Sequence, residues 1–156
     1  MPRLLRRKPT STSTNPERRV ATPAGWTELL LEEEQRCATA GFGAGIVSID
    51  FGGSDSAAPH RERTAEILSL VEASVAWTDR FCLVTPHVVS ILAMPITEIH
   101  QLERLARRLD AVCRDAGIHA AIGWSHRRET SDLMAAWARA DANAAVAHAR
   151  HVRLVG

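Results

Sequence analysis

Features that mark membrane, secreted or zinc-binding proteins are absent from this sequence of 156 residues. No apolar run approaches the roughly 18 residues that a membrane-spanning helix needs. The basic start, residues 1–8, is followed by a stretch rich in Pro, Ser and Thr, where a signal peptide would have its apolar segment. We therefore expect a cytoplasmic protein with no membrane span.

Cysteine is also scarce. The three cysteines, Cys37, Cys82 and Cys113, are too few and too far apart for a disulfide framework or a zinc site. Each lies among apolar residues at periodic spacing, which is typical of buried free thiols in a reducing compartment. The histidines show no spacing typical of metal ligands, so the sequence predicts neither a metal site nor a cofactor.

Lysine is almost missing, since Lys8 is the only lysine among 19 basic residues. Arginine in place of lysine, together with abundant alanine, is explained more simply by coding bias than by nucleic-acid binding. The net charge of +1 nevertheless hides an asymmetry. Residues 1–19 hold six basic side chains and one acid, so they carry the positive charge while residues 20–156 are mildly acidic.

We interpret residues 1–19 as a flexible basic N-terminal arm, because the segment has too few apolar residues to bury. Its basic cluster is Arg3, Arg6, Arg7 and Lys8. The arm suits contact with nucleic acid, an anionic surface or an acidic partner, and phosphorylation of the Ser/Thr run at 10–14 would offset its charge. The interpretation we favour is a solvated tail without function.

The body, residues 20–156, alternates helical and strand patterns. Thr97 is expected to cap the third helix, and Thr130 or Ser131 the fourth. A turn near Pro86-His87 would join the two middle strands as a hairpin. Helices are predicted over 25–39, 59–77, 97–116 and 130–150, and strands over 44–50, 80–85, 88–94, 118–124 and 152–155. The prediction is an α/β (α+β) fold with a mixed central sheet of about five strands flanked by helices, in the order α-β-α-β-β-α-β-α-(β).

Several segments resemble, in the same order, the motifs of GGDEF (diguanylate cyclase) domains. The segment Ala136-Trp137-Ala138-Arg139-Ala140-Asp141-Ala142 is similar to the family's "RADxAxYxAK" helix, and Ala121-Ile122-Gly123-Trp124 to its "SIGIA" strand. Residues 46–51 resemble its first strand, 105–109 a later helix, and 22–26 a worn form of its "LTGLPNR" entry. The resemblance covers about Val20 to Val155 and implies a GGDEF or nucleotidyl-cyclase fold.

The family's signature positions are altered. In members, two GTP molecules meet across a homodimer, and two carboxylates, one on the first strand and one in the GGDEF hairpin, hold metal ions on the triphosphate. Asp50 matches the strand carboxylate. Aligning Asp79 with an upstream Asp places Thr85-Pro86-His87-Val88-Val89 over the signature, and a shift by one residue places 86–90 there. Neither register offers a glycine for close backbone approach or a carboxylate for a hard cation.

Other family positions are changed as well. The product-inhibition motif "RxxD" aligns with Ala76-Trp77-Thr78-Asp79, so its Asp is present and its Arg is not. The helix lysine that approaches phosphate matches His148, and the family tyrosine matches Ala145. Asp50 could hold a metal or a phosphate, or cap the turn at Gly52-Gly53, which is the commoner role of Asp in such a place.

These departures predict a degenerate GGDEF-like domain, residues 20–156, that is not a diguanylate cyclase. We expect a regulatory protein-interaction module in cytoplasmic signalling, with Thr85, Pro86, His87, Val88 and Val89 as an interaction surface for a protein partner. The alternative is a sensor that binds GTP or cyclic di-GMP without turnover, with Asp50 and Asp79 as ligand-binding residues. The family also makes a homodimer an option.

Overall fold

The computed structural model describes residues 20–52 and 60–155, and the side chains of residue 60 and of 151–155 are outside the description. The predicted arm, with Arg3, Arg6, Arg7 and Lys8, lies outside the described residues. The helices are α2 (Pro23–Ala40), α3 (His60–Ser74), α4 (Gln101–Asp115) and α5 (Leu133–Val155), and a short 3-10 helix η1 spans Arg127–Glu129. The strands are β1 (Gly45–Asp50), β2 (Arg80–Thr85), β3 (Val88–Ala93) and β4 (Ala121–His126).

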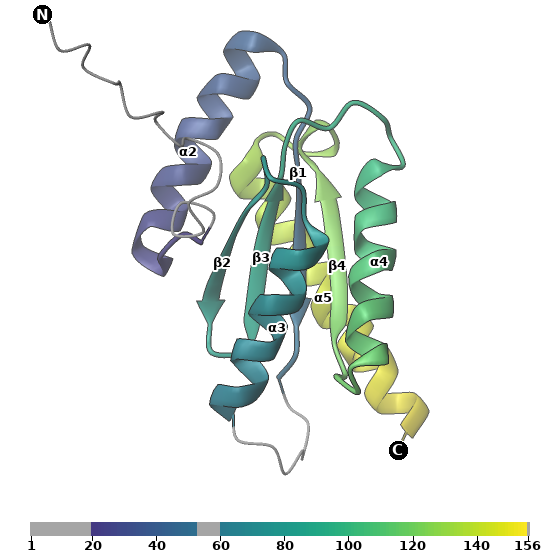
Figure 1. The fold of residues 1–156 in the computed structure, drawn as a ribbon. Coiled ribbons are helices and arrows are strands. Elements are labelled where there is room, and N and C mark those ends of the chain that lie inside the picture. Colours follow the sequence, from purple (N-terminus) through teal and green to yellow (C-terminus); the bar gives the residue numbers. More distant parts are fainter. Residues whose placement is uncertain (1–19, 53–59, 156) are drawn as a thin grey trace, which may run out of the picture.

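The four strands form one antiparallel sheet in the order β2-β3-β1-β4 (Figure 1). The hairpin predicted around Pro86-His87 is confirmed, because Thr85 pairs with Val88 across this two-residue turn. β1, the first strand of the sheet in sequence, lies between β3 and β4. β2 and β4 are therefore the two edges.

Helices cover both faces of the sheet, with α3 and α4 on one side and α2 and α5 on the other (Figure 1). Because side chains alternate along a strand, Val47 and Ile49 pack against α3 and α4, whereas Ile46 packs against α2 and α5. Each face thus has its own apolar core. This double cover explains why β1 is buried from Gly45 to Ile49.

Local sequence explains the ends of α2. The Thr22 hydroxyl oxygen accepts a hydrogen bond from the Gly25 N–H at 3.0 Å, and Pro23 occupies the first turn, where its missing N–H has no helical partner to lose. Gly41 ends the helix with φ +73°, a left-handed conformation that favours glycine. No helix among the described residues is long and apolar enough to cross a membrane.

Four details of the predicted secondary structure are wrong. Neither Thr130 nor Ser131 caps the last helix, because α5 begins at Leu133 and the Asp132 carboxylate accepts from the Ala135 N–H at 2.8 Å. The strand expected over 152–155 is part of α5, which continues to Val155, so the described sheet has four strands and not about five. α4 begins at Gln101 with His100 at its N-cap, and not at Thr97. The Gln101 side-chain oxygen accepts from the Thr97 N–H at 3.0 Å. This hydrogen bond fixes residues 97–100, which precede the helix, against its first turn. α3 ends at Ser74, three residues before Trp77.

Candidate functional site

The end of β1 meets the β2–β3 turn at one end of the sheet, and the predicted site residues Asp50 and His87 come together there. The Phe51 N–H donates to the His87 carbonyl oxygen at 2.9 Å, which extends the β1–β3 ladder by one residue pair. The Asp50 carboxylate accepts from the Gly52 N–H at 3.0 Å. Asp50 therefore closes a local turn, the structural role that Asp frequently has beside glycine.

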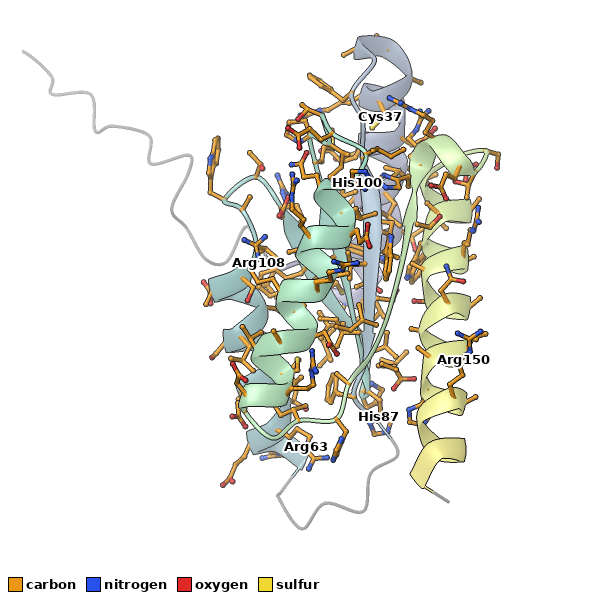
Figure 2. The ribbon with its side chains drawn as sticks, turned by 90° about the vertical axis from the view of Figure 1, so that its right-hand side faces the viewer. Cys37, Arg63, His87, His100, Arg108 and Arg150 are labelled. Atoms are coloured by element: carbon orange, nitrogen blue, oxygen red, sulfur yellow. The ribbon has the colours of Figure 1, made fainter. Side chains whose placement is uncertain are left out.

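The His87 side chain lies directly against the backbone of Gly52. A Cβ atom placed on Gly52 would lie 2.6 Å from the Cβ and 2.7 Å from the Cγ of His87. The His87 N–H also donates to the Thr85 hydroxyl at 3.2 Å, so the turn is held from inside. Figure 2 shows His87 at this end of the sheet. The His87 side chain thus packs against the end of β1 while the residue stays exposed to solvent.

The five predicted hairpin residues differ in accessibility. Thr85, Pro86 and His87 are exposed, Val88 is half-buried, and Val89 is fully buried in the core shared with α3 and α4. Solvent therefore reaches mainly the first three of these residues, at the tip of the hairpin. Val89 has a packing role, which follows from the alternation of β3.

Asp79 lies at the opposite end of the sheet from Asp50 and forms part of the fold. Its carboxylate accepts from the Ala76 N–H at 2.8 Å and from the Met94 N–H at 3.2 Å, and the residue is 6% exposed. These bonds clamp the turn between α3 and β2 and present Trp77 to solvent, where it is 70% exposed. The structure does not bring Asp50 and Asp79 together.

Asp141 is a residue of this region to which sequence reasoning gave no role. It lies on α5 above β1, where its carboxylate accepts a hydrogen bond from the buried Ser48 hydroxyl. Burial raises the pKa of Asp141, the Ser48 hydrogen bond opposes that rise, and the Asp50 carboxylate adds to it. The Asp50 and Asp141 carboxylates are therefore close enough to interact electrostatically on the α5 side of the sheet. The sequence signal was a serine inside the otherwise apolar segment 44–49.

A second polar contact repeats this pattern one strand away. Ser90 on β3 pairs with Ser48 on β1, and its buried hydroxyl accepts from the Trp137 indole N–H at 3.0 Å. Trp137 and Asp141 are one helical turn apart, so α5 is fixed to the middle of the sheet by two side-chain hydrogen bonds. Over residues 20–52 and 60–155 the structure contains no group of three or more His, Cys, Asp or Glu side chains that could hold a metal ion.

Comparison with solved structures identifies the fold. The FimX GGDEF domain from Pseudomonas aeruginosa superposes with a TM-score of 0.73 at 15% identity, covering 89% of this chain and 95% of that chain. The GGDEF domain of YfiN (TpbB) from the same organism gives 0.67 at 16% identity, with 83% and 91% covered. A DGC protein from Thermotoga maritima gives 0.63 at 15% identity, with 77% and 89% covered.

Sequence comparison adds nothing to the structural likeness. No protein-family model matches the chain, and no curated protein matches it at a significant level. The structural matches nevertheless confirm the predicted resemblance: the chain has a GGDEF-like fold, a mixed α+β architecture with an antiparallel sheet and helices on both faces.

Proposed function

We propose that this chain is a GGDEF-like domain without diguanylate cyclase activity, which serves as a regulatory protein-interaction module in cytoplasmic signalling. The observation that carries the proposal is the contact between His87 and Gly52 at the end of β1. A cyclase site needs open space there for a triphosphate and its metal ions, with carboxylate ligands on both sides. Here the turn offers Pro86 and His87, neither of which is a carboxylate, and the His87 side chain packs against the backbone of Gly52.

The role of Asp50 supports the same conclusion. Its carboxylate accepts from the Gly52 N–H, and Asp141 is the acidic neighbour whose pKa it raises. Asp141 already accepts from Ser48 and belongs to the packing of α5. One turn-forming carboxylate and one helix-anchoring carboxylate make a poor pair for two-metal phosphoryl transfer, which relies on ligands that are free to bind the ions.

Incubation of the purified chain with GTP and Mg²⁺ tests the inactivity directly. We expect no cyclic di-GMP by liquid chromatography and mass spectrometry, while an active diguanylate cyclase assayed in parallel forms it. A His87→Gly variant, which removes the side chain that packs against Gly52, is assayed alongside the wild-type chain. Product formed by the wild-type chain would refute the proposal, and product formed only by the variant would support the blocking role of His87.

The alternative, a sensor that binds GTP or cyclic di-GMP without turnover, receives less support. Its candidate ligands, Asp50 and Asp79, lie at opposite ends of the sheet, and Asp79 is buried with both carboxylate oxygens bonded to backbone. Titration calorimetry with each nucleotide distinguishes the two functions. Saturable heat that is lost in an Asp50→Asn variant would favour the sensor.

A further inference from the structure

The two edges of the sheet are protected to different degrees. Along β2, the Ala21 N–H donates to the Phe81 carbonyl at 2.8 Å, Val20 forms a parallel bridge with Phe81, and the pairing with β3 is irregular between Leu83 and Thr85. Added chain and irregular pairing are ways in which proteins protect an edge strand. In the described part of the chain, β4 pairs regularly with β1, and no further strand lies beyond it.

The pairing pattern shows which backbone groups of β4 point away from the sheet. The Arg127 N–H donates to the Ala44 carbonyl at 2.9 Å, and this bond continues the β1–β4 ladder. In an antiparallel pair, bonded and non-bonded residues alternate, so Gly123 and Ser125 point toward β1. The backbone groups of Ile122, Trp124 and His126 must therefore point outward.

A side chain of α5 agrees with this assignment, since the Asn143 amide donates to the Trp124 carbonyl at 3.2 Å. Within residues 20–52 and 60–155, the N–H groups of Ile122, Trp124 and His126 have no hydrogen-bond partner. In Figure 2, β4 runs between α4 and α5 with this edge toward the viewer. The Trp124 side chain is 37% exposed beside it.

We propose that the β4 edge binds an extended segment of a partner protein by strand addition, which gives the proposed interaction role a surface distinct from the hairpin tip. The outward N–H groups of Ile122, Trp124 and His126 are spaced two residues apart. The carbonyl groups along one extended strand have the same spacing and can accept from all three. The residue opposite Trp124 lies on the face of the sheet that Trp124 occupies. An aromatic or β-branched side chain fits there, because such cross-strand pairs are favourable.

The packing of α5 argues against a second copy of this chain as the occupant. A Cβ atom on Gly123 would lie 2.3 Å from both the Ala140 oxygen and the Ala144 nitrogen, so the α5 backbone lies directly over β4. Two paired β4 strands would be only about 4.8 Å apart. Their α5 helices would need about 8–10 Å between axes. A single strand that carries no helix avoids this clash.

Selection of peptides on the full chain tests the proposal. The probe is a displayed library of eight-residue peptides, and selected peptides are then synthesised and titrated. We expect bound peptide to slow hydrogen exchange at the Ile122, Trp124 and His126 amides. The matched variants are Trp124→Pro and Trp124→Ala. Both remove the indole and only the first removes an outward N–H, which an edge strand tolerates.

Trp124→Pro should bind the peptide about tenfold more weakly than Trp124→Ala, because one peptide carbonyl loses its donor. His126→Pro with His126→Ala repeats the comparison if the first pair does not fold. Equal affinities within a folded pair, protection of amides elsewhere, a dimer with protected β4 amides, or the absence of any enriched peptide would each overturn the proposal. The GTP assay is independent of these outcomes, so failure at the edge leaves the inactivity proposal standing.

Discussion

Replacement of Gly123 by alanine should strongly destabilise the fold, because the backbone of α5 touches the strand backbone there. The added Cβ would lie 2.3 Å from the Ala140 oxygen and from the Ala144 nitrogen, where ordinary contacts begin at 3.4 Å. The helix must therefore move by about 1 Å or the strand must bend. Neither atom belongs to a side chain that could rotate away.

Overpacking of a well-packed core costs about 1–3 kcal/mol, and we expect Gly123→Ala to lie at the upper end, about 3 kcal/mol. For a domain of this size that loss lowers Tm by roughly 10 °C. The shift of α5 would also strain the Ser48–Asp141 and Ser90–Trp137 hydrogen bonds, which depend on the height of the helix above the sheet. Urea unfolding followed by circular dichroism measures the change in free energy.

Gly117→Ala is the matched control. Gly117 has φ +72° and nothing within 4 Å of an added Cβ, so the substitution tests backbone conformation without a steric clash. The left-handed conformation should cost about 1–2 kcal/mol. If Gly123→Ala proves no more destabilising than Gly117→Ala, α5 does not lie as close to β4 as the structure has it, and the argument against a second copy at the β4 edge fails with it.

Three further predictions concern buried or partly buried carboxylates. The pKa of Asp141 is raised in the folded state, so this residue lowers the free energy of unfolding as the pH rises from about 4 through the raised pKa. Asp141→Asn keeps an acceptor for Ser48 and should flatten that part of a curve of stability against pH. Parallel curves for the wild type and the variant would contradict the raised pKa. Glu34 should behave in the opposite sense, because its two hydrogen bonds to Arg127, at 2.7 and 2.6 Å, lower its pKa. Glu34→Gln should lower the free energy of unfolding by about 1–3 kcal/mol at pH 7, and by less as the pH falls through the lowered pKa. A difference between wild type and variant in urea unfolding that stays constant down to about pH 3 would count against the ion pair. Asp79→Ala removes the charged acceptor of two part-buried backbone hydrogen bonds and should lower the free energy of unfolding by about 2–4 kcal/mol. A change below about 1 kcal/mol would show that water replaces the carboxylate.

Much of the fold could be predicted because apolar periodicity and turn residues lie close together in the sequence. The pattern of residues 44–50 and the Pro86-His87 turn gave β1 and the β2–β3 hairpin nearly at their observed bounds. Residues 152–155 were mistaken for a strand because valine favours strands, whereas the preceding alanine-rich helix could continue through them without any local stop signal. Local propensity could not choose between these outcomes.

The site needed information that no local pattern contains. Asp141 and Ser48 are 93 residues apart, and only the packing of α5 over β1 brings the carboxylate to the hydroxyl. Strand order is equally non-local, so the sequence could not identify β4 as the edge. Nor could it indicate that the His87 side chain packs against Gly52, because that contact depends on the register of β1 with β3.

The tryptophans also allow the folded state to be followed by absorption, fluorescence and circular dichroism. The chain has no tyrosine, so its near-ultraviolet absorption comes almost wholly from four indoles. Trp26 and Trp137 have ring centres 6.3 Å apart and planes at 80°, close enough for their excited states to couple. Trp77 is 70% and Trp124 37% exposed, so a soluble quencher such as acrylamide reaches these two first. Quenching that spares Trp26 and the partly buried Trp137 would report on the turn before β2 and on the β4 edge. Loss of the coupled signal in near-ultraviolet circular dichroism would report that α5 has left the sheet.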